Sequence, residues 1–415
     1  MMKTPTHLLL AAATSALMVG AAVAQDDTSV VVIDQVQLDN VWSEMNVEIQ
    51  DYAREATATS TAVGNAAAGL VTSGSIDLDT FQTLEGDVRA ESQLLGGTAG
   101  TAVATTTAYG NSTTGGTWDG NTYYRTEQTA NGDVEANTNV NMTGADTIAT
   151  ATTAIANVSV PTNEYGDHSA FQIQDSNGSV TSTTTVDMEN PDVCCDSSAS
   201  FGTTAGGNAL SSTGWSSTSI NGAVQTTATG ETIQATTRVA MDDGNNVLAA
   251  TTAFGNSATL HNEWGYATLG RDGSEVFQGN DSDIVSESYV TLDDWSGYAT
   301  SSAYGVGNAA TVSNVGSDTG LYANQNNYGD VTVTAGLNGS STYGGDGIVT
   351  STAIGNAATA TLCNICGDAA LQGRTQQVNG GNVVAYGTAT VGASGSVYGA
   401  ATAVGNSATY QSNGD

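Results

Sequence analysis

Apolar and polar residues alternate along most of this chain with a period of two. Typical stretches are 249–256, which reads Ala-Ala-Thr-Thr-Ala-Phe-Gly-Asn, and 331–335, which reads Val-Thr-Val-Thr-Ala. β-Branched residues in such an alternation, separated by Asn-Gly and Gly-Asp pairs, are typical of strands joined by tight turns. No stretch of useful length repeats its apolar residues every 3.6 positions. The pattern therefore predicts an all-β protein with few helices.

One short phrase, Thr-Ala-(apolar)-Gly-Asn with its variants, returns eight times between the start of the repetitive region and the last line of the sequence. The apolar residue at its centre marks the repeat and falls at Val63, Tyr109, Ile155, Phe201, Phe254, Tyr304, Ile354 and Val404. Successive centres are 46 residues apart three times, then 53 once, then 50 three times. Eight copies at nearly constant spacing indicate a repeat protein.

The phrase also suggests which side of each strand faces inward. Side chains alternate across a strand, and the central position is Val, Tyr, Ile or Phe in every copy, so we expect these eight residues to form an internal apolar stack. The glycine after the centre permits a turn or bulge. The asparagine that follows can repeat as a ladder of amide hydrogen bonds, formed by Asn65, Asn111, Asn256, Asn356 and Asn406. The reverse arrangement, with Ala, Gly and Ser packed inside a narrow core, stays open.

The composition limits how the units can pack. Only 6% of residues are aromatic and 50 are glycine, which is poor material for a thick core. A solenoid avoids this difficulty, because each coil pairs its backbone with the coils on either side and needs only a thin apolar centre. We therefore expect an elongated, β-helix-like β-solenoid of about eight units of 46–53 residues. Two coils per unit would give about 16 layers and a rod on the order of 75 Å, whereas one coil per unit would give a different length.

Three segments are expected along the chain. Residues 1–24 resemble a secretory signal peptide, because an apolar stretch over 8–24 ends in Ala22-Val23-Ala24. Residues 25–50 are less repetitive and suit a leading strand and cap, which repeat arrays need at their ends. Residues 51–415 form a single repeat domain. No second hydrophobic span follows the signal, so we expect an exported protein without an integral membrane span.

The net charge of the chain argues against nucleic acids as partners. The chain carries 41 Asp and Glu against 7 Lys and Arg, a formal net charge of −34. Such a charge repels phosphate backbones and anionic membranes, which argues against nucleic-acid binding. Only 12% of residues are charged, and the carboxylates are scattered. This distribution favours an ordered, soluble, acidic surface over a disordered chain.

The four cysteines form two local pairs, Cys194 with Cys195 and Cys363 with Cys366. In an exported chain, disulfides are the expected state. The two pairs lie more than three units apart, so in a solenoid they cannot readily meet. We expect a local bond between Cys363 and Cys366 that pins a turn, together with a strained vicinal bond between Cys194 and Cys195. Linkage between molecules stays open.

The sequence gives little sign of catalytic chemistry. His168 and His261 are isolated, so we expect them to be solvated surface groups, and no Ser-His-Asp constellation or Gly-x-Ser-x-Gly elbow is present. Segments such as 344–347, Gly-Gly-Asp-Gly, are turns in our interpretation, because the repeated nonapeptide of calcium-binding β-rolls is absent. We expect no enzymatic activity, no metal site and no cofactor.

The repeated Gly-Asn-Ser-Ala phrases at 46–50-residue spacing, the acidic and lysine-poor mature chain, and the signal peptide together resemble the holdfast anchor proteins of stalked alphaproteobacteria, of the HfaD type. The resemblance covers nearly the whole chain. It implies a cell-surface protein that tethers an adhesive polysaccharide, the holdfast, to the envelope. It also implies two partners, a small curlin-like protein and an outer-membrane secretion lipoprotein. The family brings no catalytic residues.

Our interpretation is an exported structural attachment protein at the outer face of the outer membrane, retained by envelope partners and contacting an adhesive polysaccharide. Exposed Tyr and Trp, with Thr and Asn, would face sugar rings and hydroxyls. Self-assembly is a further expectation, because solenoid ends and edges template strand pairing. Two alternatives stay open: an amyloid-like surface fibre subunit, and a β-helical polysaccharide-active enzyme with a localised cleft of clustered carboxylates or arginines.

Overall fold

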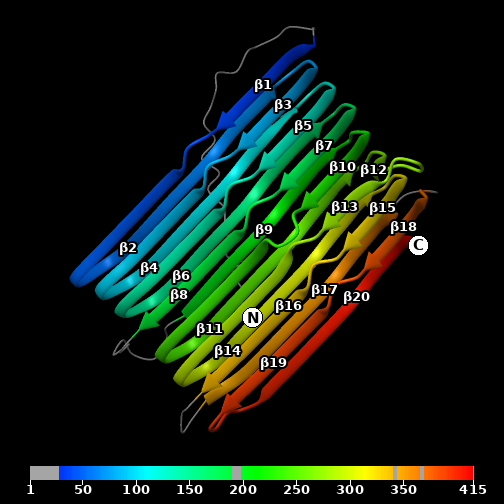
Figure 1. The fold of residues 1–415 in the computed structure, drawn as a ribbon. Coiled ribbons are helices and arrows are strands. Elements are labelled where there is room, and N and C mark those ends of the chain that lie inside the picture. Colours follow the sequence, from blue (N-terminus) through cyan, green and yellow to red (C-terminus); the bar gives the residue numbers. More distant parts are fainter. Residues whose placement is uncertain (1–27, 189–197, 340–343, 365–368, 415) are drawn as a thin grey trace, which may run out of the picture.

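The computed structural model describes residues 28–188, 198–339, 344–364 and 369–414, and within these ranges the secondary structure consists of strands without helices (Figure 1). One sheet contains β1 (Ser29–Gln37), β3 (Ile76–Leu84), β5 (Thr122–Ala130), β7 (His168–Ser176), β10 (Ser219–Thr227), β12 (Ala267–Leu269), β13 (Val276–Asn280), β15 (Thr319–Asn327) and β18 (Leu371–Asn379). The other contains β2 (Val41–Val71), β4 (Val88–Thr117), β6 (Val134–Glu164), β8 (Val180–Met188), β9 (Ser198–Trp215), β11 (Thr232–Glu263), β14 (Asp283–Val315), β16 (Val331–Gly339), β17 (Gly344–Asn364), β19 (Val383–Val391) and β20 (Val397–Gly414). The expectation of an all-β solenoid is confirmed.

Each repeat unit makes one coil of the solenoid. In the second coil, β3 runs through a three-residue turn into the first part of β4, which bends near Gly96 and Gly97 and returns as a long segment over 98–117. Two nine-residue strands placed end to end thus form one layer, and the long segment forms the opposite layer. The next coil repeats this path 46 residues later in parallel register, so that Val63 pairs with Tyr109 and Ile76 with Thr122.

One coil per unit decides the shape of the molecule. Eight coils stacked at roughly 4.8 Å span about 34 Å, whereas a 20-residue segment at 3.3 Å per residue extends about 65 Å across the stack. Figure 1 shows the resulting slab, in which the strands run across the stack and the coils follow one another from blue to red. The arrangement differs from the two-coil rod considered from the sequence.

A β-branched column illustrates why the sequence forms this stack. The first or second residue of the second short strand is Val or Ile in all eight coils, and each pairs with the next: Val41, Val88, Val134, Val180, Ile233, Ile284, Val331 and Val383. The six in the middle are buried. Burial of such a side chain contributes about 1.5–3 kcal/mol, and β-branched residues suit the extended backbone.

Seven of the eight central residues of the repeated phrase do not form the core, contrary to our expectation, and only Phe201 among them is fully buried. Tyr109 lies on the outer side of its strand and is partly exposed, whereas the neighbouring Ala108 is fully buried. The space inside is narrow, because a Cβ added at Gly110 would lie 3.1 Å from the Leu84 side chain of the opposite layer. Only small residues fit there, so the reverse arrangement that we had left open is the one observed.

A break in the strand pairing at the glycine explains how alanine and asparagine both face inward. The pairing runs from Val63 with Tyr109 directly to Asn65 with Asn111 and skips Gly64. The unpaired glycine, present in both strands, interrupts the alternation, so the asparagine turns to the interior instead of sharing the outer side with the central residue.

Two of the eight aligned centres are corrected by the register. Phe254 pairs with Gly206 and with Val306, rather than with Phe201 and Tyr304. The third to sixth spacings between successive centres are therefore 51, 48, 52 and 48 residues instead of 46, 53, 50 and 50. Extra residues shift the phrase along the strand in these two coils. The corrected column is Val63, Tyr109, Ile155, Gly206, Phe254, Val306, Ile354 and Val404.

The stretch expected to be a leading strand and cap forms part of an ordinary coil. β1 pairs with β3, and residues 41–49 of β2 pair with β4, in the same arrangement as in later coils. Among the described residues, the first coil is therefore the exposed end of the stack.

Candidate functional site

The asparagines of the repeated phrase form a continuous ladder through all eight coils. Each side-chain amide donates a 2.8 Å hydrogen bond to the Oδ1 of the asparagine in the next coil. The rungs are Asn65, Asn111, Asn157, Asn208, Asn256, Asn308, Asn356 and Asn406. The five residues that we had named are all rungs. The other three were missed because the phrase is altered or shifted in their coils.

A second ladder, of glutamines, was not anticipated. Its rungs are Gln35, Gln82, Gln128, Gln174, Gln225, Gln278, Gln325 and Gln377, and each Nε2 donates a 2.8 Å bond to the Oε1 of the preceding coil. The sequence did contain a signal, since these glutamines occur shortly before the turn that ends the first short strand. The alternation of side chains along the strand points them inward.

The two ladders also join the layers of each coil. Asn111 on the long segment donates to the backbone oxygen of Thr129 on the opposite layer at 3.0 Å, and Gln128 on that layer donates to the oxygen of Val158 at 3.0 Å. Buried amides are stabilising only when their hydrogen bonds are made, and here every interior rung has partners both along and across the stack. The ladders hold the coils in register and make the slab stiff.

One histidine is part of the interior, contrary to the expectation of a solvated group. His168 begins β7 and is 1% exposed, with its Nε2 3.4 Å from the Ser212 hydroxyl. Burial lowers the pKa of His168 to about 4, against an ordinary 6.5, although the hydrogen bond with Asn221 raises it slightly. The side chain is therefore neutral at physiological pH.

The cysteine expectations fall mostly outside the described residues. Cys194, Cys195 and Cys366 all lie there. Cys363 is half-buried near the end of β17, where its backbone pairs with Val315 and Asn413. The bond between Cys363 and Cys366 stays a prediction.

Exposed aromatic side chains gather at one corner of the coil, where the long segment turns into the next short strand. Trp118, Tyr165, Trp215 and Trp264 occupy this corner in four successive coils, with 48–58% of each residue exposed. We call these four residues the corner row. Figure 1 shows the corners aligned along the rim where β5, β7 and β10 begin. Carboxylates from Asp119, Glu164 and Glu263 lie beside the rings in the chain.

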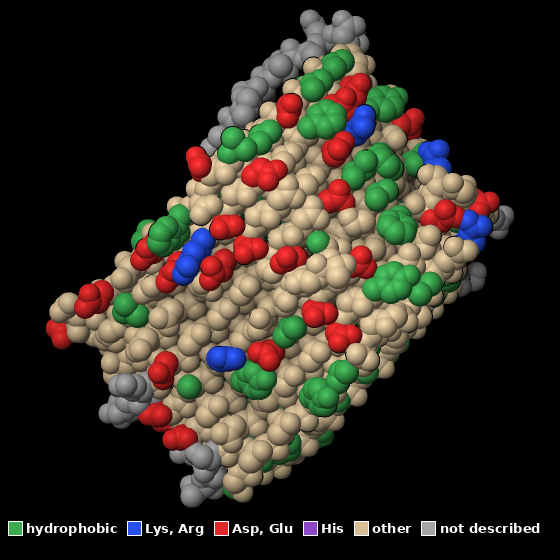
Figure 2. All heavy atoms as spheres, viewed as in Figure 1, with side chains coloured by type: hydrophobic (Ala, Val, Ile, Leu, Met, Phe, Trp, Pro, Cys, Tyr) green, Lys and Arg blue, Asp and Glu red, His purple; other side chains and the backbone are tan. Residues whose placement is uncertain are grey.

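The surface over the short strands is mixed. Figure 2 shows hydrophobic side chains among many carboxylates and few cations on the face carrying β1, β3 and β5. Arg125 lies 5.7 Å from the centre of the Phe81 ring, and Arg89 lies 5.8 Å from that of Trp42. Several of the few arginines are thus held against aromatic rings or carboxylates.

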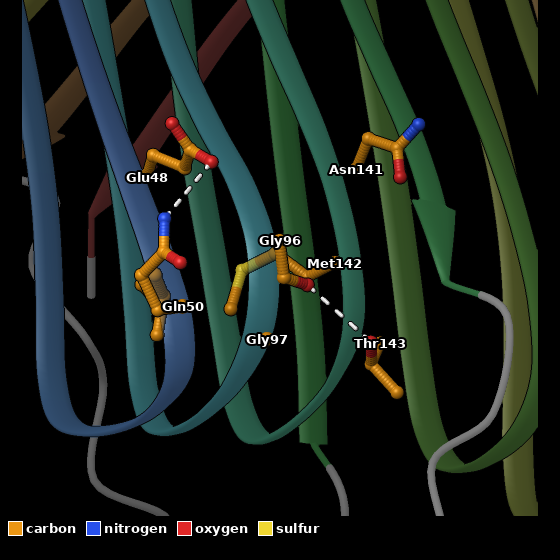
Figure 3. A pocket seen from close by; sticks show the side chains of 8 residues that line it. Glu48, Gln50, Gly96, Gly97, Asn141, Met142 and Thr143 are labelled. Carbon is orange, nitrogen blue, oxygen red and sulfur yellow. Dashed lines mark hydrogen bonds between the residues drawn. The ribbon is translucent and has the colours of Figure 1, made fainter.

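One hollow of about 370 Å³ lies at the bends of the first three coils (Figure 3). Its lining includes one carboxylate, Glu48, whose Oε1 accepts a hydrogen bond from Gln50 at 3.3 Å. Glycoside hydrolysis ordinarily uses two carboxylates, so this lining does not favour the enzyme alternative. In the described part of the chain, no group of three or more His, Cys, Asp and Glu residues is placed to hold a metal ion.

Comparison with known protein families decides the relationship. The family model of HfaD, holdfast attachment protein D, matches residues 50–330, more than half of the chain. The chain belongs to the HfaD family. The match confirms the resemblance drawn from the repeated phrases. It reaches from the bend at residue 50 in the first coil to the turn after β15 in the seventh. No curated protein and no solved structure matches the chain significantly.

Membership of the HfaD family gives the ladders and the corner row a context, which is attachment of a holdfast at the cell surface or envelope. Within the described residues, no helix is long and apolar enough to cross a membrane.

Proposed function

We propose that this protein is a structural attachment factor that anchors an adhesive polysaccharide to the outer envelope. The observation that carries the proposal is the HfaD family match over residues 50–330. The fold supports it, because two buried amide ladders and a parallel backbone network connect every coil to the next. An anchor must transmit force without unfolding, and this network spreads a load over many hydrogen bonds. On this proposal the protein lies at the extracellular face of the outer membrane, held by envelope proteins.

Cell fractionation and adhesin retention test the proposal. A strain lacking this protein should shed its adhesive polysaccharide into the medium, and restoring the wild-type gene should stop the shedding. The protein itself should fractionate with the envelope. Normal polysaccharide retention in the deletion strain would refute the anchor role.

A second candidate, a surface fibre built from copies of this chain, is favoured by the polarity of the ladders. Every amide of the asparagine ladder donates toward the last described coil, so the donor left over at that end belongs to Asn406, and the acceptor left over at the other end is the Oδ1 of Asn65. The glutamine ladder runs in the opposite sense, with the Gln377 oxygen at one end and the Gln35 amide at the other. The last coil of one molecule therefore matches the first coil of another, and such head-to-tail contacts do not close.

Sedimentation and electron microscopy of the purified protein test the fibre. Salt should promote linear assemblies by screening the net charge of −34. Gln377→Lys should block growth, because it buries an unpaired charge at the contact, whereas Tyr386→Lys on an outer face should not. A wild-type protein that stays monomeric at high concentration and high salt would refute the fibre.

A further inference from the structure

Two residues of the corner row, Tyr165 and Trp264, have an unusual backbone conformation. The positive-φ residues other than glycine in the described chain are Tyr165 at 54°, Ser216 at 50° and Trp264 at 60°. All three occupy the same corner position in consecutive coils, since the backbone N–H of each donates to the next coil in the same way. Bulky residues rarely adopt this left-handed conformation.

Glycine serves the same corner position in the next coil. Gly316 has a φ of 78°, and its N–H donates to the following coil as those of the other three do. A glycine would therefore satisfy the turn without strain. Residues that keep a strained backbone conformation where glycine would adopt it without strain are concentrated at functional sites. The turn itself therefore does not require the aromatic rings at Tyr165 and Trp264, since Ser216 and Gly316 make the same turn without a ring.

The rings are also arranged as a supported, stepped surface. The ring centroids of Trp118 and Tyr165 lie 6.4 Å apart, with planes inclined by 55°. The Trp264 ring lies against Gly316 of the next coil, where an added Cβ would come within 2.7 Å of it. The row alternates between two adjacent chain positions, because Trp215 pairs with Glu164 and with Glu263. Every second coil therefore places a carboxylate where its neighbour places a tryptophan.

This combination fits a chain of sugar rings. The C–H faces of a sugar ring pack on flat aromatic surfaces, and its hydroxyls donate hydrogen bonds to carboxylates beside them. One ring per coil at roughly 4.8 Å gives the row a length of about 14 Å, enough for a short stretch of polysaccharide lying along the stack. The carboxylates of Asp119, Glu164 and Glu263 repel a polymer that itself carries carboxylates.

We propose that the corner row of Trp118, Tyr165, Trp215 and Trp264 binds a polysaccharide free of acidic sugars, with successive sugar rings stacked on the aromatic rings. This inference rests on the proposed attachment function and assigns its contact surface. The ligand lies across the edges of four coils, so the binding surface exists only when these coils are stacked.

The test uses purified full-length protein and the adhesive polysaccharide extracted from wild-type cells. Trp118→Ala, Trp215→Ala and Trp264→Gly are combined in one variant, in which the last change copies the residue found at position 316. Affinity should fall at least about tenfold, and the change in tryptophan fluorescence on binding should disappear. Trp42→Ala, which removes an exposed tryptophan outside the row, should bind as the wild type does. Polygalacturonate, an acidic polymer, should not compete.

A folded triple variant that binds as tightly as the wild type would overturn the inference, as would effective competition by polygalacturonate. Trp264→Gly alone gives an independent check, because it relaxes the backbone: it should leave the protein at least as stable and still weaken binding. Loss of stability in this single variant would instead indicate a structural role for the ring. The anchor proposal is tested by a different measurement. It would be refuted by normal polysaccharide retention in cells that lack the protein, whatever the binding experiment shows.

Discussion

Replacement of a central rung of the asparagine ladder tests the role of the ladders most directly. Asn208 donates to Asn256 at 2.8 Å and to the backbone oxygen of Thr226 at 2.8 Å, and it accepts from Asn157 at 2.8 Å. Asn208→Ala leaves two buried groups of the ladder without a partner, one N–H of Asn157 and the Asn256 Oδ1, and it also removes the bond to the Thr226 oxygen. A buried unpaired group costs about 1–3 kcal/mol, so with two such groups the variant should lose about 2–6 kcal/mol of unfolding free energy.

The last rung supplies the matched control. Asn406 is exposed, and its ladder contact is the 2.8 Å bond that it accepts from Asn356. Water can replace that bond, so Asn406→Ala should lose no more than about 1 kcal/mol. The two variants change the same side chain in the same repeated phrase and differ in their position along the stack.

Denaturant titration followed by circular dichroism measures both variants, and hydrogen exchange locates the loss. Exchange in Asn208→Ala should rise first in the coils on either side of residue 208, because each coil contacts only its neighbours. Equal destabilisation at the two positions, or a loss below about 1 kcal/mol at position 208, would refute the view that the buried ladder holds the coils together.

Three further predictions concern pH, packing and the cysteines. Because His168 has a pKa of about 4 in the folded protein and about 6.5 when unfolded, only the unfolded state binds the proton between these pH values. The unfolding free energy should therefore fall by roughly 3 kcal/mol as the pH drops from 6.5 to 4. His168→Asn should remove this part of the pH dependence of stability. Gly132→Ala should destabilise the protein by more than about 2 kcal/mol in thermal unfolding, because the added Cβ meets a carbonyl oxygen of the previous coil, whereas Gly399→Ala meets nothing within 4 Å and should be nearly neutral. Mass spectrometry after alkylation should show Cys363 and Cys366 protected until a reductant is added, and labelling of both thiols in the oxidised protein would contradict the local bond.

The strand content and the repeat could be predicted from the sequence, because both depend on patterns within a few neighbouring residues. Alternation of β-branched and polar residues favours extended backbone in any context, and eight returns of one phrase require eight equivalent units. The roles of the glycine and the asparagine in the phrase could also be predicted from their chemistry. Glycine tolerates an irregular backbone, and a side-chain amide that repeats in every unit can form a ladder of hydrogen bonds. The family resemblance rested on the same phrases and proved correct.

Tertiary structure decided what faces inward. Alternation places Tyr109 and Ala108 on opposite sides of a strand but does not say which side is buried. The close approach of the Leu84 side chain to Gly110 shows that the inner side has room only for small residues. The strand register likewise shows that Gly206, rather than Phe201, is equivalent to Phe254 of the next coil. Equivalent positions are set by backbone pairing between neighbouring coils, not by similarity of the phrases.

The sequence by itself determined that this protein is a stack of about eight similar β units, because that information lies in patterns within a few residues and in their repetition. Only the tertiary structure decided that each unit is one coil, that glutamines form a second buried ladder, and that four aromatic rings align on one corner. These features depend on contacts between residues about 50 positions apart, and the free energy of such contacts depends on which residues meet across coils and layers, not on the local chain.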